Sequence, residues 1–409
     1  MNFFYDFGIL IYRLGISISS LWNLKARQWI KGRKNLFQKI QSSLQPNETR
    51  IWFHCASVGE FEQGRPVIEG YRKRFPRHKI VLSFFSPSGF EQKKNYSGAD
   101  YIFYLPIDTK VNAKKFLSLI QPKLAVFVKY EFWWNHLAEL KRNAVETILI
   151  SAVFREEQFF FRWFGKSFLE LLKGFKMIFL QDENSFQLLK KYGIENAMVA
   201  GDTRFDRVWE IAQHPVELPV IKEFKGDKKL FVGGSTWEED EEVLLKLIDD
   251  SSDEWKFVIV PHEINHSTLH VQHYSEIEKR KSFSSEKILL VDKTGLLSSI
   301  YQYADVAYIG GGFGKGIHNT LEAAVFGIPV LFGPRYQKFS EAKQLIANGG
   351  GRAVSNLDEL KSAFDFFLQA ENILHGESNR NFVEQKRGAT EKILYYLESI
   401  NSGSAASAE

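Results

Sequence analysis

Short apolar runs alternate with longer amphipathic stretches along most of the chain. The runs are rich in Val, Ile, Leu and Phe and predict buried strands, whereas the stretches between them have helical spacing. Strands that alternate with helices predict parallel sheets flanked by helices. The expected strands are 51–56, 80–85, 101–106, 124–128, 147–151, 177–180, 199–200, 230–232, 257–260, 288–291, 306–309 and 329–332.

The pattern loosens once, between 208 and 229, where Pro215, Pro219 and Gly226 interrupt it before it restarts. At 409 residues the chain is long enough for two domains. We therefore predict an α/β fold of two similar domains facing across a cleft, with a final amphipathic helix at about 382–400 that crosses back. The expected segments are 1–40 for a membrane-associating helix and its basic collar, 41–207 and 208–400 for the two domains, and 401–409 for a flexible tail or expression remnant.

The N-terminal segment combines an apolar helix with a basic collar. Residues 1–22 are apolar but contain Asp6 and Arg13, whereas a spanning helix needs about 20 mostly apolar residues without central charges. No small-residue cleavage site follows, which argues against a secretory signal. Residues 1–47 carry a net charge of +6, although the whole chain carries only +4. This asymmetry predicts a helix that lies on an anionic membrane surface, with a helix packed on the domain as the alternative.

Composition narrows the class of protein further. The single cysteine, Cys55, excludes an internal disulfide framework and a zinc site built on several thiolates, and it fits a reducing compartment. A near-neutral body does not suit a nucleic-acid-binding protein, which spreads basic charge over its surface. Aromatic residues make up 15% of the chain, with 36 Phe, and we expect part of this excess to contact lipid.

A glycine-rich loop at 310–316 joins an expected strand to a short expected helix at 321–326. Glycines let the backbone approach a ligand closely, and free amides at a helix start suit a phosphate. Asn319 can cap that helix, and Glu322 in its first turn can accept hydrogen bonds from a ribose. An ordinary Gly-rich turn explains the glycines alone equally well. The next strand ends at 333–335, so the two loops would share the carboxyl edge where open α/β sheets bind ligands.

Other polar side chains of the second half are weaker candidates. Ser235 and Thr236 follow two glycines and could offer hydroxyl and amide groups to a phosphate. Arg204 and Arg335 could clamp an anion, although a solvated surface arginine is the simpler explanation. No metal site is expected, because the histidines lack the spacing of a metal-binding helix. Those histidines are His262, His266 and His318.

In the first half, Glu60 is the leading candidate for chemistry. It follows a strand and a glycine turn at an expected helix start, which exposes its carboxylate and favours the ionised form. Such a carboxylate can act as a general base, and a helix cap is an equally good explanation. Glu131 and Lys129 follow another strand, where a salt bridge that shapes the loop is slightly favoured over direct chemistry. Trp133 and Trp134 could stack on a sugar, but core packing is expected for at least one.

These motifs together resemble the 3-deoxy-D-manno-octulosonic acid (Kdo) transferases of lipopolysaccharide synthesis, over nearly the whole chain. The most specific match is 51–60, Ile-Trp-Phe-His-Cys-Ala-Ser-Val-Gly-Glu. The family has Ser-Val-Gly-Glu after a strand there, and the resemblance implies that Glu60 is the catalytic base. The family's Glu-Thr-Glu-Leu-Trp-Pro-Asn segment resembles 129–135, where Glu131, Trp133 and Asn135 are kept.

Two further segments resemble the family, and two positions depart from it. The turn 86–89 is similar to a Thr-x-Thr-Gly segment on the acceptor side, and 316–324 is similar to Gly-Gly-His-Asn-Pro-Leu-Glu-Pro-Ala in the second domain. Lys129 stands where the family has Glu. The family's Pro-Arg-His-x-Glu-Arg loop lacks its arginines at 261–266, which puts the donor contacts of this loop in doubt.

The resemblance implies two Rossmann-like domains of GT-B type, CMP-Kdo as donor, a lipid A precursor as acceptor, and the cytoplasmic face of the inner membrane as location. We expect an inverting transfer without a cofactor or a metal ion. The expected site residues are Glu60 and Glu131 for catalysis; Ser57, Gly59, Ser86, Ser88, Gly89 and Lys129 for the acceptor; and Arg204, Ser235, Thr236, His262, Gly311, Gly312, Gly314, Lys315, Asn319 and Glu322 for the donor.

Two alternatives remain open from the residues. A GT-B relative that uses a UDP-sugar, or an epimerase acting on one, would also need the glycine-rich loop and Glu322. A peripheral membrane protein whose α/β domains only bind nucleotide or partner proteins would bind without turnover. The Ser-Val-Gly-Glu motif favours Kdo transfer over both.

Overall fold

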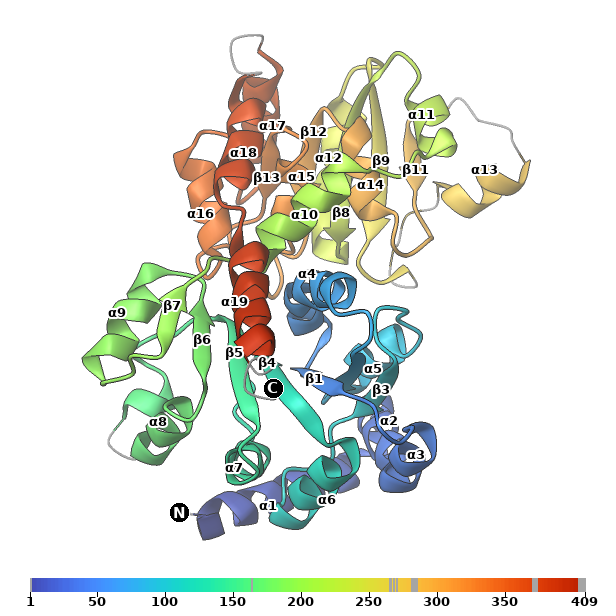
Figure 1. Cartoon of the computed structure of the whole chain (residues 1–409). Helices are drawn as coiled ribbons and strands as arrows, with labels where there is room; N and C mark the ends of the chain where they lie inside the picture. Colours follow the sequence, from blue (N-terminus) through green and yellow to red (C-terminus); the bar gives the residue numbers. More distant parts are fainter. Residues whose placement is uncertain are drawn as a thin grey trace. The chain divides into compact units, whose positions relative to one another are not determined.

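The computed structural model describes residues 2–162, 165–264, 267, 269, 271–280, 286–369 and 374–403 (Figure 1). The chain divides into two compact units. Unit 1 comprises Met1–Asp206 and Gly388–Glu409, and unit 2 comprises Arg207–Arg387. The division falls beside the expected boundary after residue 207. Residues 388–400, the C-terminal part of the final helix that we expected to cross back from the second domain, pack within unit 1.

Unit 1 is built on a seven-stranded parallel sheet in the order β3-β2-β1-β4-β5-β6-β7. This is the Rossmann order, and it sets the carboxyl ends of β1 and β4 side by side where the strand order reverses. The strands are β1 Arg50–Cys55, β2 Lys79–Phe84, β3 Tyr101–Tyr104, β4 Pro122–Val128, β5 Glu146–Ala152, β6 Met177–Leu180 and β7 Ala197–Val199. The helices are α1 Asn2–Ser19, α2 Leu24–Arg33, α3 Leu36–Ser43, α4 Val58–Arg74, α5 Pro87–Lys93, α6 Lys110–Ile120, α7 Trp134–Arg142, η1 Phe159–Phe161, α8 Lys166–Leu172, α9 Glu183–Lys191 and α19 Ala389–Gly403, and α10 Thr203–Gln213 begins in unit 1 and continues into unit 2.

The sheet of unit 1 is apolar on both faces because helices cover both. Along β1, Ile51 and Phe53 join the core on one side with Phe61 of α4. Trp52 points to the other side and joins a second core with Phe116 of α6. Side chains alternate across a strand, so a strand covered on both faces is apolar throughout, as the sequence pattern of this strand predicted.

Unit 2 repeats this arrangement with the parallel order β10-β11-β9-β8-β12-β13-β14. Its switch point lies between β8 and β12. The strands are β8 Lys229–Thr236, β9 Trp255–Pro261, β10 Gln272–His273, β11 Ile288–Leu290, β12 Val306–Ile309, β13 Val330–Phe332 and β14 Gly351–Ala353. The helices are α11 Pro219–Lys225, α12 Glu238–Asp250, α13 Tyr274–Arg280, α14 Leu297–Ile300, η4 Tyr301–Tyr303, α15 Leu321–Ala324, α16 Ser340–Ala347, α17 Leu357–Leu368 and α18 Leu374–Gln385.

All twelve expected strands are present, and two short edge strands were missed. β10 and β14 contain only two and three residues, too few for a periodic signal. The helix expected at 382–400 is two helices, α18 and α19, because the chain turns at Gly388 with a φ of 106°. A positive φ ends a helix where glycine supplies it. His266 and the tail beyond residue 403 lie outside the described residues.

The N-terminal helix α1 is held to unit 1 by a buried carboxylate. Asp108 accepts hydrogen bonds from the Tyr5 hydroxyl (2.5 Å) and the Asn135 amide (3.0 Å), and its other oxygen lies 2.5 Å from Nδ1 of His136. Asn135 also donates to Asp6 at 2.9 Å. Burial raises the pKa of Asp108, but the charge of His136 and these hydrogen bonds outweigh burial and hold the pKa below its usual value.

The opposite face of α1 is apolar and exposed, as the exposed fractions of Leu10 (55%) and Leu14 (61%) illustrate. One face of α1 therefore packs on the domain, as our alternative predicted, and contact of the other face with lipid stays a prediction. Among the residues that the structure describes, no helix is both long and apolar enough to cross a bilayer.

Candidate functional site

Glu60 lies at the carboxyl end of β1, in the first turn of α4. Ser57 caps this helix: its hydroxyl oxygen accepts from the Glu60 amide at 3.5 Å, and the hydroxyl donates to the Glu60 carboxylate. Gly59 is exposed, which leaves the turn open to a ligand. The carboxylate is thus half-buried and oriented by a serine, a geometry that serves a cap and a base alike.

Glu131 lies beyond the end of β4 and belongs to a hydrogen-bond network that reaches into the sheet. Its carboxylate accepts from Nε1 of Trp133 at 2.6 Å and lies 3.2 Å from Nε2 of the fully buried His54. The other ring nitrogen of His54 lies 2.8 Å from the hydroxyl of Ser83, which also accepts from Nε1 of Trp52 at 2.7 Å. Nε2 of His54 also lies 3.0 Å from Nε1 of Trp133, and Nδ1 lies 3.2 Å from the Ser83 carbonyl oxygen, so the buried ring joins Ser83, Trp133 and Glu131 in one network.

The two carboxylates of unit 1 come together at the sheet edge. Burial raises the pKa of Cys55 at the end of β1, and the charges of Glu60 and Glu131 raise it further. Both carboxylates therefore lie within electrostatic reach of one thiol, at the point where β1 and β4 diverge. The sequence predicted the two acids; it did not predict His54 and Ser83, whose signal is a polar residue inside an otherwise apolar strand.

The other predicted acceptor residues surround this edge. Ser86 caps α5, and its hydroxyl oxygen accepts from the Gly89 amide at 3.1 Å. The hydroxyl oxygen of the exposed Ser88 lies 3.3 Å from that of Ser86. Lys129 has a φ of 70°, and its ammonium lies 5.7 Å from the centre of the Tyr130 ring. Trp133 and Trp134 are half-buried: Trp133 packs on Phe85, and Trp134 packs on Tyr5 and Phe168, as expected for core contacts.

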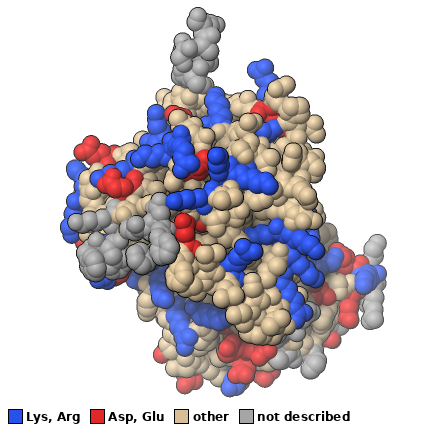
Figure 2. Space-filling view, turned by 90° about the horizontal axis from the view of Figure 1, so that it is seen from below, with Lys and Arg blue, Asp and Glu red and all other residues tan. Residues whose placement is uncertain are grey.

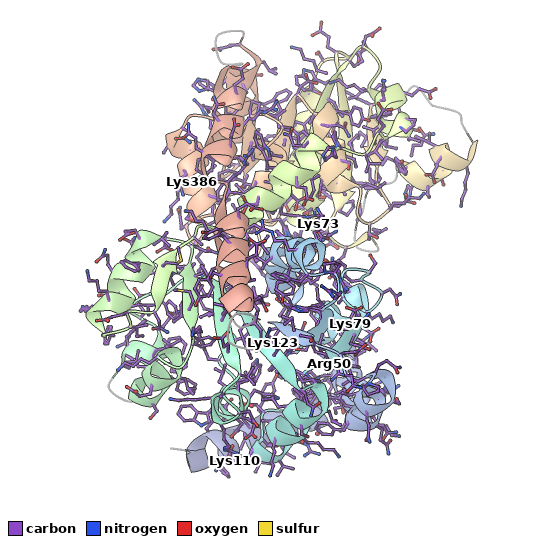
Figure 3. The ribbon with its side chains drawn as sticks, viewed as in Figure 1. Arg50, Lys73, Lys79, Lys110, Lys123 and Lys386 are labelled. Atoms are coloured by element: carbon purple, nitrogen blue, oxygen red, sulfur yellow. The ribbon has the colours of Figure 1, made fainter. Side chains whose placement is uncertain are left out.

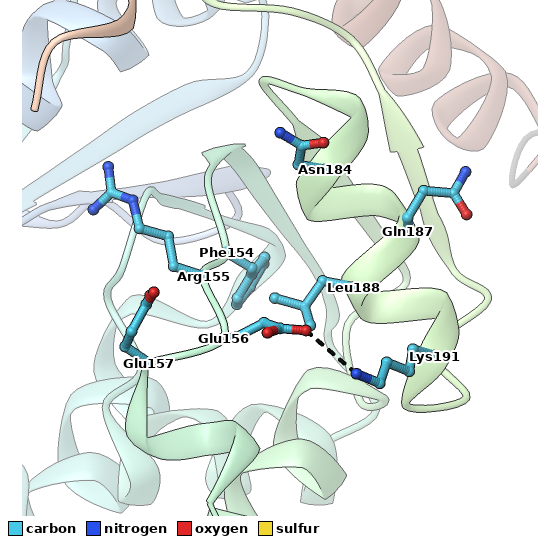
Figure 4. A pocket seen from close by; sticks show the side chains of 8 residues that line it. All are labelled: Phe154, Arg155, Glu156, Glu157, Asn184, Gln187, Leu188 and Lys191. Carbon is cyan, nitrogen blue, oxygen red and sulfur yellow. Dashed lines mark hydrogen bonds and ion pairs between the residues drawn. The ribbon is translucent and has the colours of Figure 1, made fainter.

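A pocket of about 450 Å³ lies beside the loop that follows β5 (Figure 4). Glu156 and Lys191 form an ion pair of 3.3 Å across it. Burial raises the pKa of Tyr130, the charge of Arg155 lowers it, and the charge of Glu60 raises it. Because both charges act on Tyr130, Arg155 and Glu60 lie near the same sheet edge. The sequence analysis missed Arg155, because a lone arginine in a loop carries no local signal.

In unit 2, the glycine-rich loop is packed against two neighbouring strand ends. A Cβ on Gly310 would lie 2.3 Å from the Ser235 carbonyl oxygen, and a Cβ on Gly312 would lie 2.5 Å from Cα of Gly333. The Gly311 amide donates to the buried Asp240 at 2.7 Å. These glycines are therefore explained by close backbone packing, which shapes the loop, while Gly314 and the exposed Lys315 lie at its outer side.

Asn319 and Glu322 form a polar pair at the start of α15. The Asn319 side-chain oxygen accepts from the Leu321 amide at 3.2 Å, although the N-cap residue of α15 is Thr320 and not Asn319. Its amide donates to one oxygen of Glu322 at 3.0 Å, and Ser298 donates to the other at 2.9 Å. The Glu322 carboxylate is thus fixed in orientation and only half-buried, as a group that binds hydroxyls requires.

Three aromatic rings from three strand ends stack at the same edge. Trp237 follows β8, His262 follows β9, and His318 ends the glycine-rich loop. The two histidine rings lie 4.3 Å apart and the Trp237 and His262 rings 4.8 Å apart, both stacked. Trp237 donates from Nε1 to Nε2 of His318 at 3.1 Å. Burial, helped by the charge of His262, lowers the pKa of His318 to about 4, so His318 is neutral and carries its proton on Nδ1.

Two predicted donor contacts have other partners in the structure. The Thr236 hydroxyl is buried and donates to Glu241 at 3.0 Å, so it is not free for a phosphate. Arg204 donates to Asp202 from two nitrogens, at 2.9 and 2.6 Å. Ser235 remains half-exposed, with a φ of 55° that few side chains adopt. Arg335 donates to the Gly314 carbonyl and so supports the loop.

The described residues contain no group of three or more His, Cys, Asp or Glu side chains placed to hold a metal ion. Metal independence of the reaction stays a prediction.

Comparisons with known proteins show which family the chain resembles. Residues 30–207 match the family model described as 3-deoxy-D-manno-octulosonic-acid transferase (kdotransferase). A 3-deoxy-D-manno-octulosonic acid transferase of Aquifex aeolicus is 27% identical over 377 residues, which cover 90% of this chain and 98% of the relative. One of Rickettsia felis is 27% identical over 365 residues, covering 85% and 78%.

Solved structures agree on the fold. UDP-GlcNAc 2-epimerase from Neisseria meningitidis aligns with a TM-score of 0.61 at 14% identity, over 86% of this chain and 100% of that one. A glycosyltransferase from Rickettsia africae aligns with a TM-score of 0.55 at 14% identity, over 87% and 99%. At such identities the likeness concerns the fold alone, which is the two-domain GT-B type. With this fold, residues 30–207 match the family model of 3-deoxy-D-manno-octulosonic acid transferases, and relatives of that name are similar to the chain over most of its length.

Proposed function

We propose that the protein transfers Kdo from CMP-Kdo to a lipid A precursor, with inversion at the anomeric carbon. The match to the family model and the names of the relatives support the reaction class. The observation that carries the assignment of roles is the placement of Glu60 and Glu131 just beyond the carboxyl ends of β1 and β4, the neighbouring strands at the switch point of unit 1. Open α/β sheets place their ligands at this point.

In the proposed reaction, the Glu60 carboxylate takes the proton of the acceptor hydroxyl. The freed oxygen forms a bond to the anomeric carbon of Kdo, and the bond from that carbon to the phosphate oxygen of CMP breaks, with its electron pair leaving on CMP. Donation from the Ser57 hydroxyl orients the Glu60 carboxylate before the reaction. Glu131 is held in place by Trp133 and His54. Its carboxylate accepts a hydrogen bond from a neighbouring hydroxyl of the acceptor and so fixes the acceptor in place.

On the donor side, unit 2 offers complementary groups. The flat stack of Trp237, His262 and His318 suits the face of a nucleobase. Glu322 suits the ribose hydroxyls, and Nδ1–H of the neutral His318 is a donor for the phosphate. We assign the negative charge that develops on the leaving CMP to such preorganised donors and expect no metal ion to be required.

We also place the protein on the cytoplasmic face of the inner membrane, with the exposed apolar face of α1 against anionic lipid. A membrane-bound acceptor explains why an enzyme without a spanning helix among its described residues exposes such a face.

The deciding experiment is transfer of Kdo from CMP-Kdo to a lipid A precursor, read by mass spectrometry, with a chelator present. We expect Glu60→Gln to reduce the rate by about 10²–10⁴-fold, the usual contribution of a general base, while CMP binding measured by calorimetry is unchanged. The matched control is Glu62→Gln on the same helix, whose carboxylate pairs with Lys93 at 2.7 Å. Full turnover by Glu60→Gln would remove the base role.

The same experiment separates the other functions. A protein that binds UDP and not CMP would be a transferase or epimerase of UDP-sugars. A protein that binds CMP without any Kdo transfer in the wild type would be a nucleotide-binding scaffold. Loss of activity in chelator, restored by a divalent cation, would show that the leaving charge is met by a metal ion instead of protein donors.

A further inference from the structure

A basic cavity lies beside the C-terminal half of α1, apart from both sheet edges described above. Its volume is about 440 Å³, and its walls come from α1, α2, α3, the loop between β3 and α6, and Asn112 of α6 itself. Three cationic side chains line it, Arg13, Lys31 and Lys34, and all three are exposed. Within the described part of the chain, none of them has a carboxylate partner.

A fourth cation forms the inner wall. Arg33 is largely buried, and its nitrogens donate to the carbonyl oxygens of Leu105 (2.9 Å), Phe85 (2.8 Å) and Trp29 (3.2 Å). Its guanidinium carbon lies 4.0 Å from the centre of the Trp29 ring. Burial lowers the pKa of Arg33 to about 9, opposed by Tyr104 and Tyr12, so the group stays charged at neutral pH. Among the described residues no acid compensates this charge, and an anion in the cavity would.

The surface beside the cavity is apolar. Successive residues of a helix are about 100° apart, so Phe7, Leu10, Leu14 and Ile18 form one stripe along α1, and Arg13 lies at its margin. These four apolar side chains are exposed. Figure 2 views this end of unit 1 from below and shows Lys and Arg side chains among broad uncharged surface. A molecule with acyl chains on the stripe would bring its headgroup to Arg13.

We propose that this cavity binds the phosphate group of an anionic membrane lipid, while the acyl chains of that lipid lie along the apolar stripe of α1. Guanidinium and ammonium groups bind phosphate through charge-assisted hydrogen bonds, which are stronger than the diffuse attraction of a basic surface. The proposal rests on the membrane association proposed above. It goes beyond that association because it predicts a site that recognises phosphate, not only negative charge.

The test compares two double variants of equal charge. Arg13→Gln/Lys34→Gln removes two cavity cations. Lys110→Gln/Lys114→Gln removes two exposed cations of α6, at the same end of unit 1 but outside the cavity; Lys110 is labelled in Figure 3. Binding is measured by flotation with phosphatidylcholine vesicles that contain either phosphatidic acid or oleate, adjusted to the same zeta potential. Matching thermal unfolding curves show that both variants are folded.

On phosphatidic acid vesicles we expect the cavity variant to lose about tenfold more affinity than the control variant, and on oleate vesicles we expect equal losses. Inorganic phosphate at millimolar concentration should not displace the protein. Equal losses on both vesicles would overturn the cavity proposal while leaving membrane association intact. No vesicle binding by the wild type would overturn both. Displacement by inorganic phosphate alone would make the site a free-phosphate site. Kdo transfer to a detergent-solubilised acceptor reports on the proposed reaction independently.

Discussion

The buried histidine beneath Glu131 shows how single polar residues fix the unit 1 site. His54 lies in the middle of the sheet with no exposed surface, so each ring nitrogen needs a partner. Ser83 supplies one and Glu131 the other. The orientation of Glu131 at the surface is therefore determined by a serine two strands away, since β2, β1 and β4 are neighbours in the sheet.

Removing the serine hydroxyl tests this network. In Ser83→Ala, His54 and the indole of Trp52 both lose a buried partner, and an unsatisfied buried group costs about 1–3 kcal/mol. We expect the free energy of unfolding to fall by that amount in denaturant titrations, and Kdo transfer to fall more than CMP binding. The control is Ser42→Ala, whose hydroxyl lies on the exposed end of α3. An unchanged stability in Ser83→Ala would mean that water replaces the hydroxyl.

His318 makes the stability of unit 2 depend on pH. Its folded pKa of about 4 lies below the unfolded value of about 6.5, so between these pH values the unfolded chain binds a proton that the folded chain does not. Stability must then fall as the pH drops from 6.5 to 4, by at most about 3 kcal/mol. His262, whose pKa burial also lowers, adds in the same direction.

Thermal unfolding followed from pH 7 to pH 4 measures this dependence. We expect His318→Gln to flatten the curve, since glutamine does not titrate. The exposed His214 of unit 2 provides the control, because His214→Gln should leave the slope unchanged. If the stability of His318→Gln still falls with pH as in the wild type, the pH dependence belongs to other groups, such as carboxylates that form ion pairs.

The sequence predicted the candidate site residues more completely than the residues that hold them in place. Glu60 and Glu131 follow predicted strands, and Asn319 and Glu322 lie at the start of a predicted helix; the structure has all four there. Asp240, which anchors the glycine-rich loop through the Gly311 amide, was missed. Its role depends on a contact between segments 71 residues apart, and local periodicity contains no such information.

At the scale of elements, the glycine-rich loop depends on backbone packing at one position and not at another. A Cβ on Gly312 would meet Cα of Gly333 at 2.5 Å, and neither backbone can give way cheaply. A Cβ on Gly314 would lie 3.7 Å from the Gly311 carbonyl oxygen, which is ordinary contact. We expect Gly312→Ala to lower the stability of unit 2 by about 1–3 kcal/mol and to weaken CMP binding, as overpacking displaces the loop.

Gly314→Ala serves as the matched control, with near wild-type stability and affinity expected. Both variants are compared by denaturant titration and by calorimetric titration with CMP. Equal effects of the two substitutions on CMP binding would contradict this explanation. They would show that the whole loop contacts the nucleotide, and that packing at Gly312 does not set the shape of the loop.

The element pattern also shows where prediction from the sequence ends. Strands of four or more residues carry a readable apolar run, and all of them were predicted. The N-terminal helix was expected on the membrane, yet one side is docked through Tyr5 and Asp6. Asp6 looks like an interruption of an apolar helix in the sequence, and the hydrogen bond that it accepts from Asn135 explains it.

At the scale of the whole molecule, unit 1 is not continuous in sequence. The chain leaves it after Asp206 and returns at Gly388. Asp206 links the two crossings, because its carboxylate accepts from the Gly388 amide at 2.6 Å and the Thr390 amide at 2.7 Å. It thereby caps α19, whose apolar side packs on α4. The prolines at 215 and 219 revealed the first crossing in the sequence, but nothing local revealed which unit owns α19.

Because α19 packs within unit 1, we predict that a substitution near the C-terminus destabilises the N-terminal half of the chain. Leu394 is buried and packs on Gly70 of α4, so Leu394→Ala should lower the free energy of unfolding of unit 1 by about 2–4 kcal/mol. Hydrogen exchange should then speed up at amides of β1 and α4, while amides of β8 and β12 keep their rates, because stability differs between cooperative units. The neighbouring Tyr395 is 75% exposed, and Tyr395→Ala should change neither. Faster exchange in β8 as well would mean that the two units unfold together.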